Sequence, residues 1–168
     1  MKLHYVFFLA ALPLCAAGQQ IEASATSSTG IAVPPTPDRT NKTESSVFHA
    51  GPWEQKIGYS QALRVGNTIY LSGTTGVDEN GNPADLDSQM KLAYAGIQKT
   101  LAHFGADLTN VVMERIYTTD MDALIKAQET RKGIYAGWLP PATWTEVKRL
   151  YEKPAKIEIE VEARIDLH

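Results

Sequence analysis

The C-terminal part of the chain alternates strictly between apolar and charged residues. Within residues 156–165, one set is Ile157, Ile159 and Val161, and the other is Glu158, Glu160 and Glu162. A period of two places these sets on opposite faces of a β-strand, so one face is predicted to be buried and the other to carry a row of carboxylates. The residues from Pro141 onward predict a preceding strand, joined to this one by a short turn that contains proline. Lys148 and Arg149 are the cations that this preceding strand offers to the carboxylates.

Apolar residues at helical spacing predict two helices. From Leu86 to Phe104 they recur every three or four residues, which is typical of a helix with one buried face. Asp85 or Asp87 is placed to cap its first turn. Residues 121–136 predict the second helix.

Three more strands are predicted, at residues 61–65, 68–72 and 110–118. The order of elements is then ββαβαββ. It predicts an α+β fold in which a single mixed sheet carries both helices on one face. The other face of the sheet needs a cover, and association with further copies of the chain is the simplest one.

The first part of the chain has a different composition. Residues 1–18 combine a positive start, an apolar run and a small-residue end, which predicts a cleavable signal peptide and a secreted or periplasmic protein. Residues 19–47 are rich in Ser, Thr and Pro and predict a flexible linker, with Asn41 in a glycosylation sequon. The globular domain is expected over residues 48–168.

Charge and side-chain types exclude several functions. The formal net charge is −3, and the chain has no basic run, which argues against nucleic acid as a partner. It also lacks the cationic amphipathic helix of a membrane-surface binder, so no membrane contact is expected after signal cleavage. The only cysteine, Cys15, lies in the signal, and the four histidines are scattered. We therefore expect no metal site and no cofactor.

Five stretches carry a resemblance when they are taken together and in order: IGYSQAL, NTIYLSGTTGVDENGNPADLDSQM, VVMERIYTTDMD, PPATWTEVKRL and KIEIEVEA. Over residues 59–163 the chain resembles the RidA (YjgF, L-PSP) family of enamine/imine deaminases. The resemblance implies a chorismate-mutase-like fold, a homotrimer whose sheets line a barrel, and ligand clefts between subunits. It also implies hydrolysis of small imines without a cofactor.

The resemblance also implies roles for individual residues. Glu158 matches the glutamate that positions or activates water. Ser72 and Gly73 match a pair whose backbone lines the cleft, and Tyr59 matches the tyrosine that completes it. Gln128 falls where the family has an asparagine. Trp144 is either an ordinary sheet aromatic or one wall of the cleft.

One position departs from the family pattern. Thr143 stands where the deaminases have an arginine that holds the substrate carboxylate through a bidentate pair. A threonine hydroxyl cannot replace a guanidinium. Four arginines are possible substitutes: Arg64, Arg115, Arg131 and Arg149.

Three functions follow from this pattern. The first is an imine hydrolase with altered specificity, in which Glu158 acts as the base. The second is a protein that binds a small metabolite in the inter-subunit cleft without catalysis. The third, a ribonuclease, is disfavoured by the acidic charge. Apart from these functions, each site residue has a purely structural alternative: Glu158 as one of three solvated carboxylates, Tyr59 as ordinary packing, and Ser72 and Gly73 as the end of a strand.

Overall fold

The computed structural model describes residues 45–77 and 85–167, all of which lie in one compact unit. The signal peptide, Asn41 and the expected linker up to residue 44 lie outside the described residues. The elements, in chain order, are β1 (Ser45–Phe48), α1 (Pro52–Ile57), β2 (Ala62–Val65), β3 (Thr68–Leu71), β4 (Thr74–Thr75), α2 (Leu86–His103), the 3₁₀ turn Leu108–Asn110, β5 (Val111–Thr118), α3 (Met121–Lys126), α4 (Gln128–Tyr135), β6 (Ala142–Glu146) and β7 (Ile157–Arg164).

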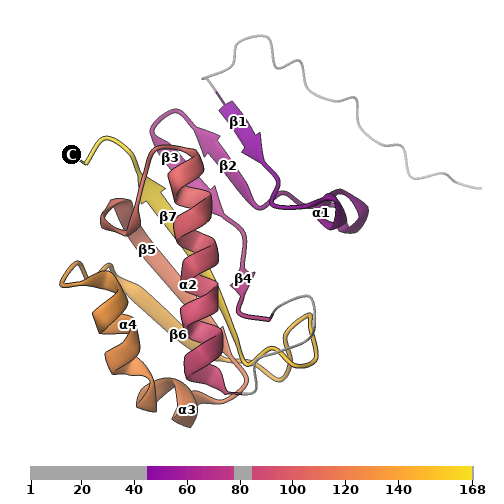
Figure 1. Ribbon diagram of the computed structural model, residues 1–168, viewed down its shortest axis with the longest axis vertical. Helices are drawn as coiled ribbons and strands as arrows, with labels where there is room; N and C mark the ends of the chain where they lie inside the picture. The colour runs from indigo at the N-terminus through magenta and orange to yellow at the C-terminus, as the bar shows by residue number, and fades with distance from the viewer. Residues whose placement is uncertain (1–44, 78–84, 168) are drawn as a thin grey trace, which may run out of the picture. The chain divides into compact units, whose positions relative to one another are not determined.

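The strands form one mixed sheet in the order β1-β2-β3-β7-β5-β6, and β4 pairs with the far end of β7. Figure 1 shows α2, α3 and α4 on the same side of this sheet. The predicted α+β class, with a single mixed sheet and helices on one face, is therefore confirmed.

The core lies between α2 and the sheet. From α2 it takes Met90, Ala93, Tyr94, Ile97 and Leu101, and from β7 it takes Ile157, Ile159, Val161 and Ala163. Each of these side chains is 1% exposed or less. Full burial of one large aliphatic side chain stabilises a fold by about 1.5–3 kcal/mol. The buried faces that the two periodicities predicted, one on α2 and one on β7, thus pack against each other in one core.

Helix caps follow the sequence closely. The Asp85 side chain accepts a hydrogen bond from Ser88 N at 2.8 Å, and that of Asp120 accepts one from Ala123 N at 2.9 Å. Each satisfies a backbone donor that the first helical turn leaves free. The predicted second helix is interrupted at Ala127, where α3 ends and α4 begins.

The predicted pairing of the two C-terminal strands was wrong. β6 does not pair with β7, because β5 lies between them. β6 runs parallel to β5, and β7 runs antiparallel to it. The chain reaches β6 from β5 through α3 and α4, and such a crossover returns it in the parallel direction. The connection to β7, residues 147–156, is correspondingly long.

The start of the domain also differs from the expectation. Ser45–Phe48 forms the edge strand β1, in register with β2 from Ser45↔Val65 to Phe48↔Ala62. The sheet therefore begins three residues before the expected boundary at residue 48. Helix α1 and the short strand β4 were not expected either.

A buried ion pair lies under the sheet. Glu114 of β5 has no exposed surface and accepts a hydrogen bond from Arg131 Nε of α4 at 2.7 Å. The hydroxyl of Tyr94 donates to the other oxygen of the same carboxylate. Burial and the Glu114 charge raise the pKa of Tyr94 far above its ordinary value, so this tyrosine stays a donor.

Candidate functional site

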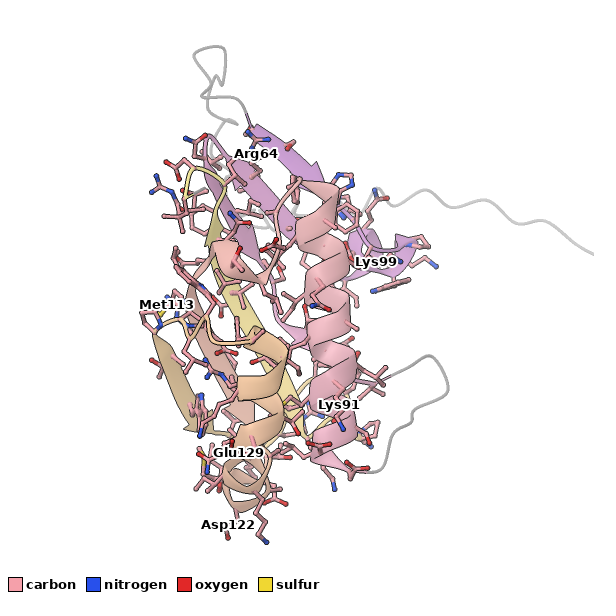
Figure 2. All side chains as sticks on the ribbon, turned by 60° about the vertical axis from the view of Figure 1, so that its left-hand side comes forward. Arg64, Lys91, Lys99, Met113, Asp122 and Glu129 are labelled. Atoms are coloured by element: carbon pink, nitrogen blue, oxygen red, sulfur yellow. The ribbon has the colours of Figure 1, made fainter. Side chains whose placement is uncertain are left out.

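A cleft of about 850 Å³ lies where the chain leaves β3 and enters β4. Its walls are Trp53 and Ile57 of α1, Tyr59 beyond that helix, Gly96, Lys99 and Thr100 of α2, and Tyr151 and Glu152 of the 147–156 connection. Figure 2 shows Lys99 on α2 beside α1. The cleft also contains Ser72, Gly73 and Glu158. Four of the residues expected at the site, Tyr59, Ser72, Gly73 and Glu158, therefore lie together.

Glu158 is the central acidic group of this cleft. On β7 it lies in register between Thr75 of β4 and Tyr117 of β5. Burial raises the pKa of the Glu158 carboxyl above its ordinary value, and the charges of Glu152 and Glu160 raise it further. Among residues 45–77 and 85–167, no side chain or backbone group forms a hydrogen bond or ion pair with this carboxylate. It is thus a base without a partner.

Gly73 leaves the space that the Glu158 carboxylate occupies. A Cβ atom at position 73 would overlap Oε1 and Cδ of Glu158. The backbone of Gly73 is not in the left-handed region, so glycine is required here for space and not for conformation. The resemblance assigned Gly73 to the cleft, and the structure supplies a steric reason for its place beside Glu158.

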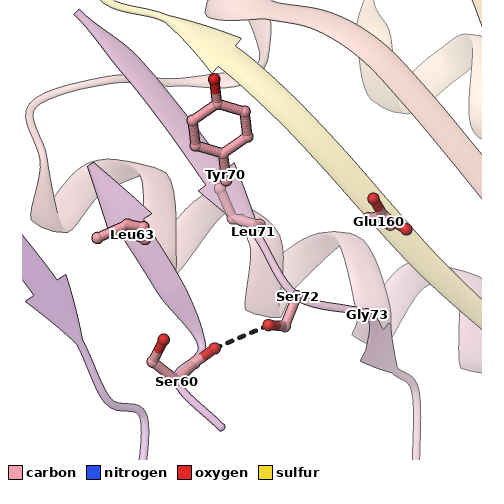
Figure 3. A pocket seen from close by; sticks show the side chains of 7 residues that line it. All are labelled: Ser60, Leu63, Tyr70, Leu71, Ser72, Gly73 and Glu160. Atoms are coloured by element: carbon pink, nitrogen blue, oxygen red, sulfur yellow. Dashed lines mark hydrogen bonds between the residues drawn. The ribbon is translucent and has the colours of Figure 1, made fainter. Parts of the chain in front are cut away.

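Ser72 fixes the backbone next to Gly73. Its hydroxyl donates to Ser60 O at 2.7 Å, as Figure 3 shows, and its N–H donates to Gln61 O at 2.9 Å. The Gln61 side chain donates to Thr74 Oγ1 at 3.0 Å. These bonds tie the strand end to the segment that follows α1. The serine side chain is therefore used to hold the backbone.

Glu54 of α1 holds the segment that carries Tyr59, through both its buried carboxylate and its main-chain carbonyl. Glu54 has no exposed surface and accepts hydrogen bonds from Ala50 N at 2.9 Å, Gln61 N at 3.1 Å and His49 Nδ1 at 3.0 Å. The Tyr59 N–H donates to Glu54 O at 3.1 Å. Burial raises the pKa of the Tyr59 hydroxyl, so it remains protonated at neutral pH.

Glu152 and Tyr151 were not predicted as site residues. They lie on the 147–156 connection, which Gln89 of α2 holds by its side chain: Nε2 donates to Pro154 O at 3.0 Å, and Oε1 accepts from Lys156 N at 2.7 Å. Thr75 donates to Glu152 Oε2 at 2.9 Å. No sequence motif predicts these residues. They reach the cleft because the 147–156 connection runs past Glu158.

Thr143 does not lie in this cleft. It is exposed on β6 and is in register with Arg115 of β5. Two strand spacings, about 10 Å, separate its strand from β7 and Glu158. Within one protomer, the structure therefore does not bring Thr143 and Glu158 together.

Two more expected site residues also lie elsewhere. Trp144 pairs with Ile116 and packs against the core on the helix-covered face, where the Arg131 guanidinium lies 5.9 Å from its ring centroid. It is a sheet aromatic and not a wall of the cleft. Gln128 is exposed at the start of α4 and does not line the cleft.

The other two carboxylates of β7 share one arginine as an ion-pair partner. Arg115 Nη1 lies 2.9 Å from Glu160 Oε1 and 3.0 Å from Glu162 Oε1. The expected partners, Lys148 and Arg149, are exposed on the connection after β6 and form none of these pairs. This distinction separates Glu158 from the other two glutamates on physical grounds.

A smaller hollow of about 390 Å³ lies on the uncovered face of the sheet. Figure 3 shows its lining, with Tyr70 and Leu63 on neighbouring strands and Glu160 on β7. Ser72 and Gly73 border both this hollow and the larger cleft. The strand end between β3 and β4 thus connects the sheet face with the cleft.

Among residues 45–77 and 85–167, no group of three or more His, Cys, Asp or Glu side chains could hold a metal ion. No helix in these ranges has the length and apolar character of a membrane span.

Comparison with known proteins places this geometry in a family. The family model described as Endoribonuclease L-PSP matches residues 53–165. A RutC family protein of Pyrococcus abyssi is 33% identical over 108 residues, which are 62% of this chain and 83% of that protein. A protein of Mus musculus named 2-iminobutanoate/2-iminopropanoate deaminase is 32% identical over 105 residues, which are 61% of this chain and 77% of that protein.

A solved structure of a protein in this family has a similar fold. The crystal structure of a YjgF family member from Mycobacterium tuberculosis has a TM-score of 0.66 and 29% identity, and the match covers 73% of this chain and all of that one. The resemblance drawn from the five stretches is therefore confirmed. This chain belongs to the L-PSP family, also called the RidA or YjgF family, some of whose members are named imine deaminases.

Proposed function

We propose that this protein hydrolyses a carbon–nitrogen double bond, with Glu158 as the general base. The observation that carries the proposal is the state of Glu158: a carboxylate without a partner among the described residues, with a raised pKa, in a cleft of about 850 Å³. A base is most effective when its pKa approaches the working pH. The 2-iminobutanoate/2-iminopropanoate deaminases among the relatives support the type of bond.

The reaction needs only water. In the first step the water oxygen bonds to the imine carbon, and its proton passes to Glu158 while the C=N π electrons move to nitrogen. Glu158 returns this proton to nitrogen and so forms a carbinolamine. In the second step Glu158 takes the proton of the new hydroxyl group and passes it to nitrogen, the oxygen lone pair forms the C=O bond, the C–N bond breaks, and a carbonyl compound and ammonia leave. No oxidant or reductant is consumed. The Tyr59 hydroxyl and the backbone around Gly73 are among the other polar groups that line this cleft.

The substrate is proposed to differ from that of a standard deaminase because of Thr143. A guanidinium that holds a substrate carboxylate contributes about 1.5–3 kcal/mol through a charge-assisted pair, and threonine offers only a neutral hydroxyl. The nearest substitute by register, Arg115, already binds two carboxylates. A substrate carboxylate would therefore meet no free guanidinium at this position.

Thr143 can approach a cleft only from another copy of the chain. Because β6 is an edge strand and Thr143 is exposed, a neighbouring protomer could present it to Glu158. We propose a homotrimer of this kind, which would also cover the open sheet face. Native mass spectrometry of the mature chain tests it, and a stable monomer at micromolar concentration would argue against it. The proposed export is tested by N-terminal sequencing of the protein recovered outside the cytoplasm.

The test of the reaction is ammonia release. Imines of different side chains are generated in the assay by an amino-acid oxidase or an amine oxidase, and the wild type is compared with Glu158→Gln. The proposal expects turnover in the wild type and loss of it in the variant. Turnover that Glu158→Gln leaves unchanged would remove Glu158 from the mechanism.

The second candidate function is binding without catalysis. Thr143 favours it, because loss of the carboxylate anchor removes the means of orienting a standard substrate. If the protein only binds, a ligand should bind with the same affinity to the wild type and to Glu158→Gln, and neither protein should hydrolyse any imine.

A further inference from the structure

The cleft around Glu158 combines exposed aromatic rings with carboxylates. Trp53 is 47% exposed, Tyr59 37% and Tyr151 71%, and all three line the cleft. They come from α1, from the segment after it and from the 147–156 connection. Large apolar side chains grouped at the surface of a hollow commonly mark a binding site. Their flat faces also attract cations through the ring quadrupole.

The carboxylates of this cleft are not neutralised. Glu152 raises the pKa of Glu158 by its charge, so the two lie close enough to repel each other. In the described part of the chain, the hydrogen-bond donor to the Glu152 carboxylate is the neutral hydroxyl of Thr75, and neither glutamate forms an ion pair. A half-buried carboxylate beside a second carboxylate is unfavourable as an anion unless a cation joins them.

The basic residue of the lining does not remove this charge. Lys99 lies on α2, while the charges that act on Glu158 are those of Glu152 and Glu160, and no cation offsets them. On the open face of the sheet, by contrast, Arg115 forms an ion pair with both Glu160 and Glu162. The cleft thus holds two carboxylates, Glu152 and Glu158, that have no ion pair among the described residues.

We infer that the cleft takes an organic cation: a substrate whose nitrogen is a protonated imine or amine, attached to an apolar or aromatic group and without a carboxylate. The rings of Trp53, Tyr59 and Tyr151 would contact the apolar group and the face of the cation, and Glu152 and Glu158 would lie beside the charge. The inference rests on the proposed function in taking Glu158 as the reacting group, and it names the substrate class of that reaction. A protonated imine is itself the more electrophilic form, so the same charge that binds it favours attack by water.

The test uses three probes of one shape and different charge: benzylamine, benzyl alcohol and benzoate. Their binding to the full mature chain is measured by calorimetry at neutral pH, with Trp53 fluorescence as a second signal. We expect benzylamine to bind about tenfold more tightly than benzyl alcohol and benzoate to bind most weakly, since a cation near an aromatic face and a carboxylate gains on the order of 1.4 kcal/mol, which is one decade. Benzoate binding as tightly as benzylamine overturns the inference.

Two variants make the test specific. Glu152→Gln should reduce the preference for benzylamine over benzyl alcohol several-fold. Glu129→Gln is the control, because it removes the same charge from an exposed site on α4 outside the cleft, as Figure 2 shows. Tyr151→Leu should weaken benzylamine more than benzyl alcohol. An unchanged preference in Glu152→Gln overturns the inference even if benzylamine binds.

The outcome is separable from that of the proposed reaction. Tight benzylamine binding without hydrolysis of any imine, including the imine that an amine oxidase forms from benzylamine, supports the cation site and counts against the hydrolase. Glu158-dependent turnover of carboxylate-bearing imines, with no preference for benzylamine, supports the hydrolase and overturns the cation site.

Discussion

The carboxylate of Glu158 occupies the volume that a side chain at position 73 would fill. Gly73 and Glu158 are far apart in the sequence, yet they form one steric unit at the junction of β3, β4 and β7. The Glu158 carboxylate can therefore take this position only because residue 73 has no side chain, in addition to its placement by β7.

The first prediction concerns this pair. Gly73→Ala should lower the turnover of any substrate by about a hundredfold, because the new methyl group moves the carboxylate by about 1 Å or more. The free energy of unfolding should change by less than about 1 kcal/mol, since the end of a flexible side chain can shift and the backbone suits alanine. Steady-state kinetics and urea unfolding measure the two quantities.

A matched control is available in α4. Nothing lies within 4 Å of a Cβ built on Gly133, which is inside the helix Gln128–Tyr135. Gly133→Ala should stabilise the protein by about 0.5–1 kcal/mol and leave turnover unchanged. If Gly73→Ala retained full activity, Gly73 would have no part in positioning Glu158.

The second prediction is that Glu158→Gln abolishes turnover and raises stability at neutral pH. Removal of a general base should cost about 10²–10⁴-fold in rate. Burial, Glu152 and Glu160 raise the folded-state pKa of Glu158, so its favourable contribution is complete below the unfolded pKa and is lost as pH rises through the folded pKa. The variant should therefore gain stability over the wild type between acid and neutral pH, measured as the difference in thermal midpoint. A lower midpoint at pH 7 would contradict this.

The third prediction is a shift in the pH profile. Turnover should rise with pH as Glu158 loses its proton. Because the charge of Glu152 helps to raise the pKa of Glu158, Glu152→Gln should move the acid limb of kcat to lower pH. Glu129→Gln, with the same change in net charge, should leave the limb in place. Equal displacement in both variants would show that only net charge matters.

The fourth prediction concerns Thr143. Thr143→Arg should create or increase the turnover of iminopropionate, because a guanidinium at this position can pair with the substrate carboxylate. The expected gain is about tenfold or more in kcat/KM. Strong activity of the wild type on iminopropionate would refute the assignment of specificity to Thr143. Thr145→Arg, two residues along the same exposed face of β6, controls for added charge.

The fifth prediction concerns the buried pair under the sheet. Arg131→Met should cost about 3–5 kcal/mol in the free energy of unfolding, because it leaves the Glu114 carboxylate buried with the Tyr94 hydroxyl as its remaining donor among the described residues. Glu114→Leu combined with Arg131→Met should recover much of that loss, since both charges are then removed. A double-mutant cycle in urea checks the coupling, and additive losses would contradict it.

The local sequence pattern was sufficient to predict the strand and the helix that form the core. The alternation of Ile157, Ile159 and Val161 predicted β7, and the helical spacing from Leu86 predicted α2, because each period reflects the burial of one face. The cap at Asp85 was predicted for the same local reason. β1 was missed because four residues at a sheet edge, mostly exposed, carry almost no pattern.

Relations between distant strands were not available from local pattern. The sequence offered Lys148 and Arg149 as partners of the carboxylates because they are near in the chain, whereas the partner is Arg115 on the neighbouring strand. In the same way, the local pattern gave no sign that the parallel placement of β6 would put a strand between Thr143 and Glu158. Tyr59 and Gly73, which the resemblance assigned to a cleft, both line the cleft of one protomer, whereas the resemblance gave no indication of Glu152.

The way in which Gln89 holds the 147–156 connection has a consequence for how new ligand preferences can arise. The two bonds from Gln89 to this connection go to main-chain atoms, Pro154 O and Lys156 N, so they do not depend on the side chains at positions 151–153. These exposed side chains, among them Tyr151 and Glu152, can be exchanged while the anchor and the register of β7 are kept. Selection or design can therefore change the side chains that positions 151–153 present to the cleft while the backbone of the connection stays anchored to α2.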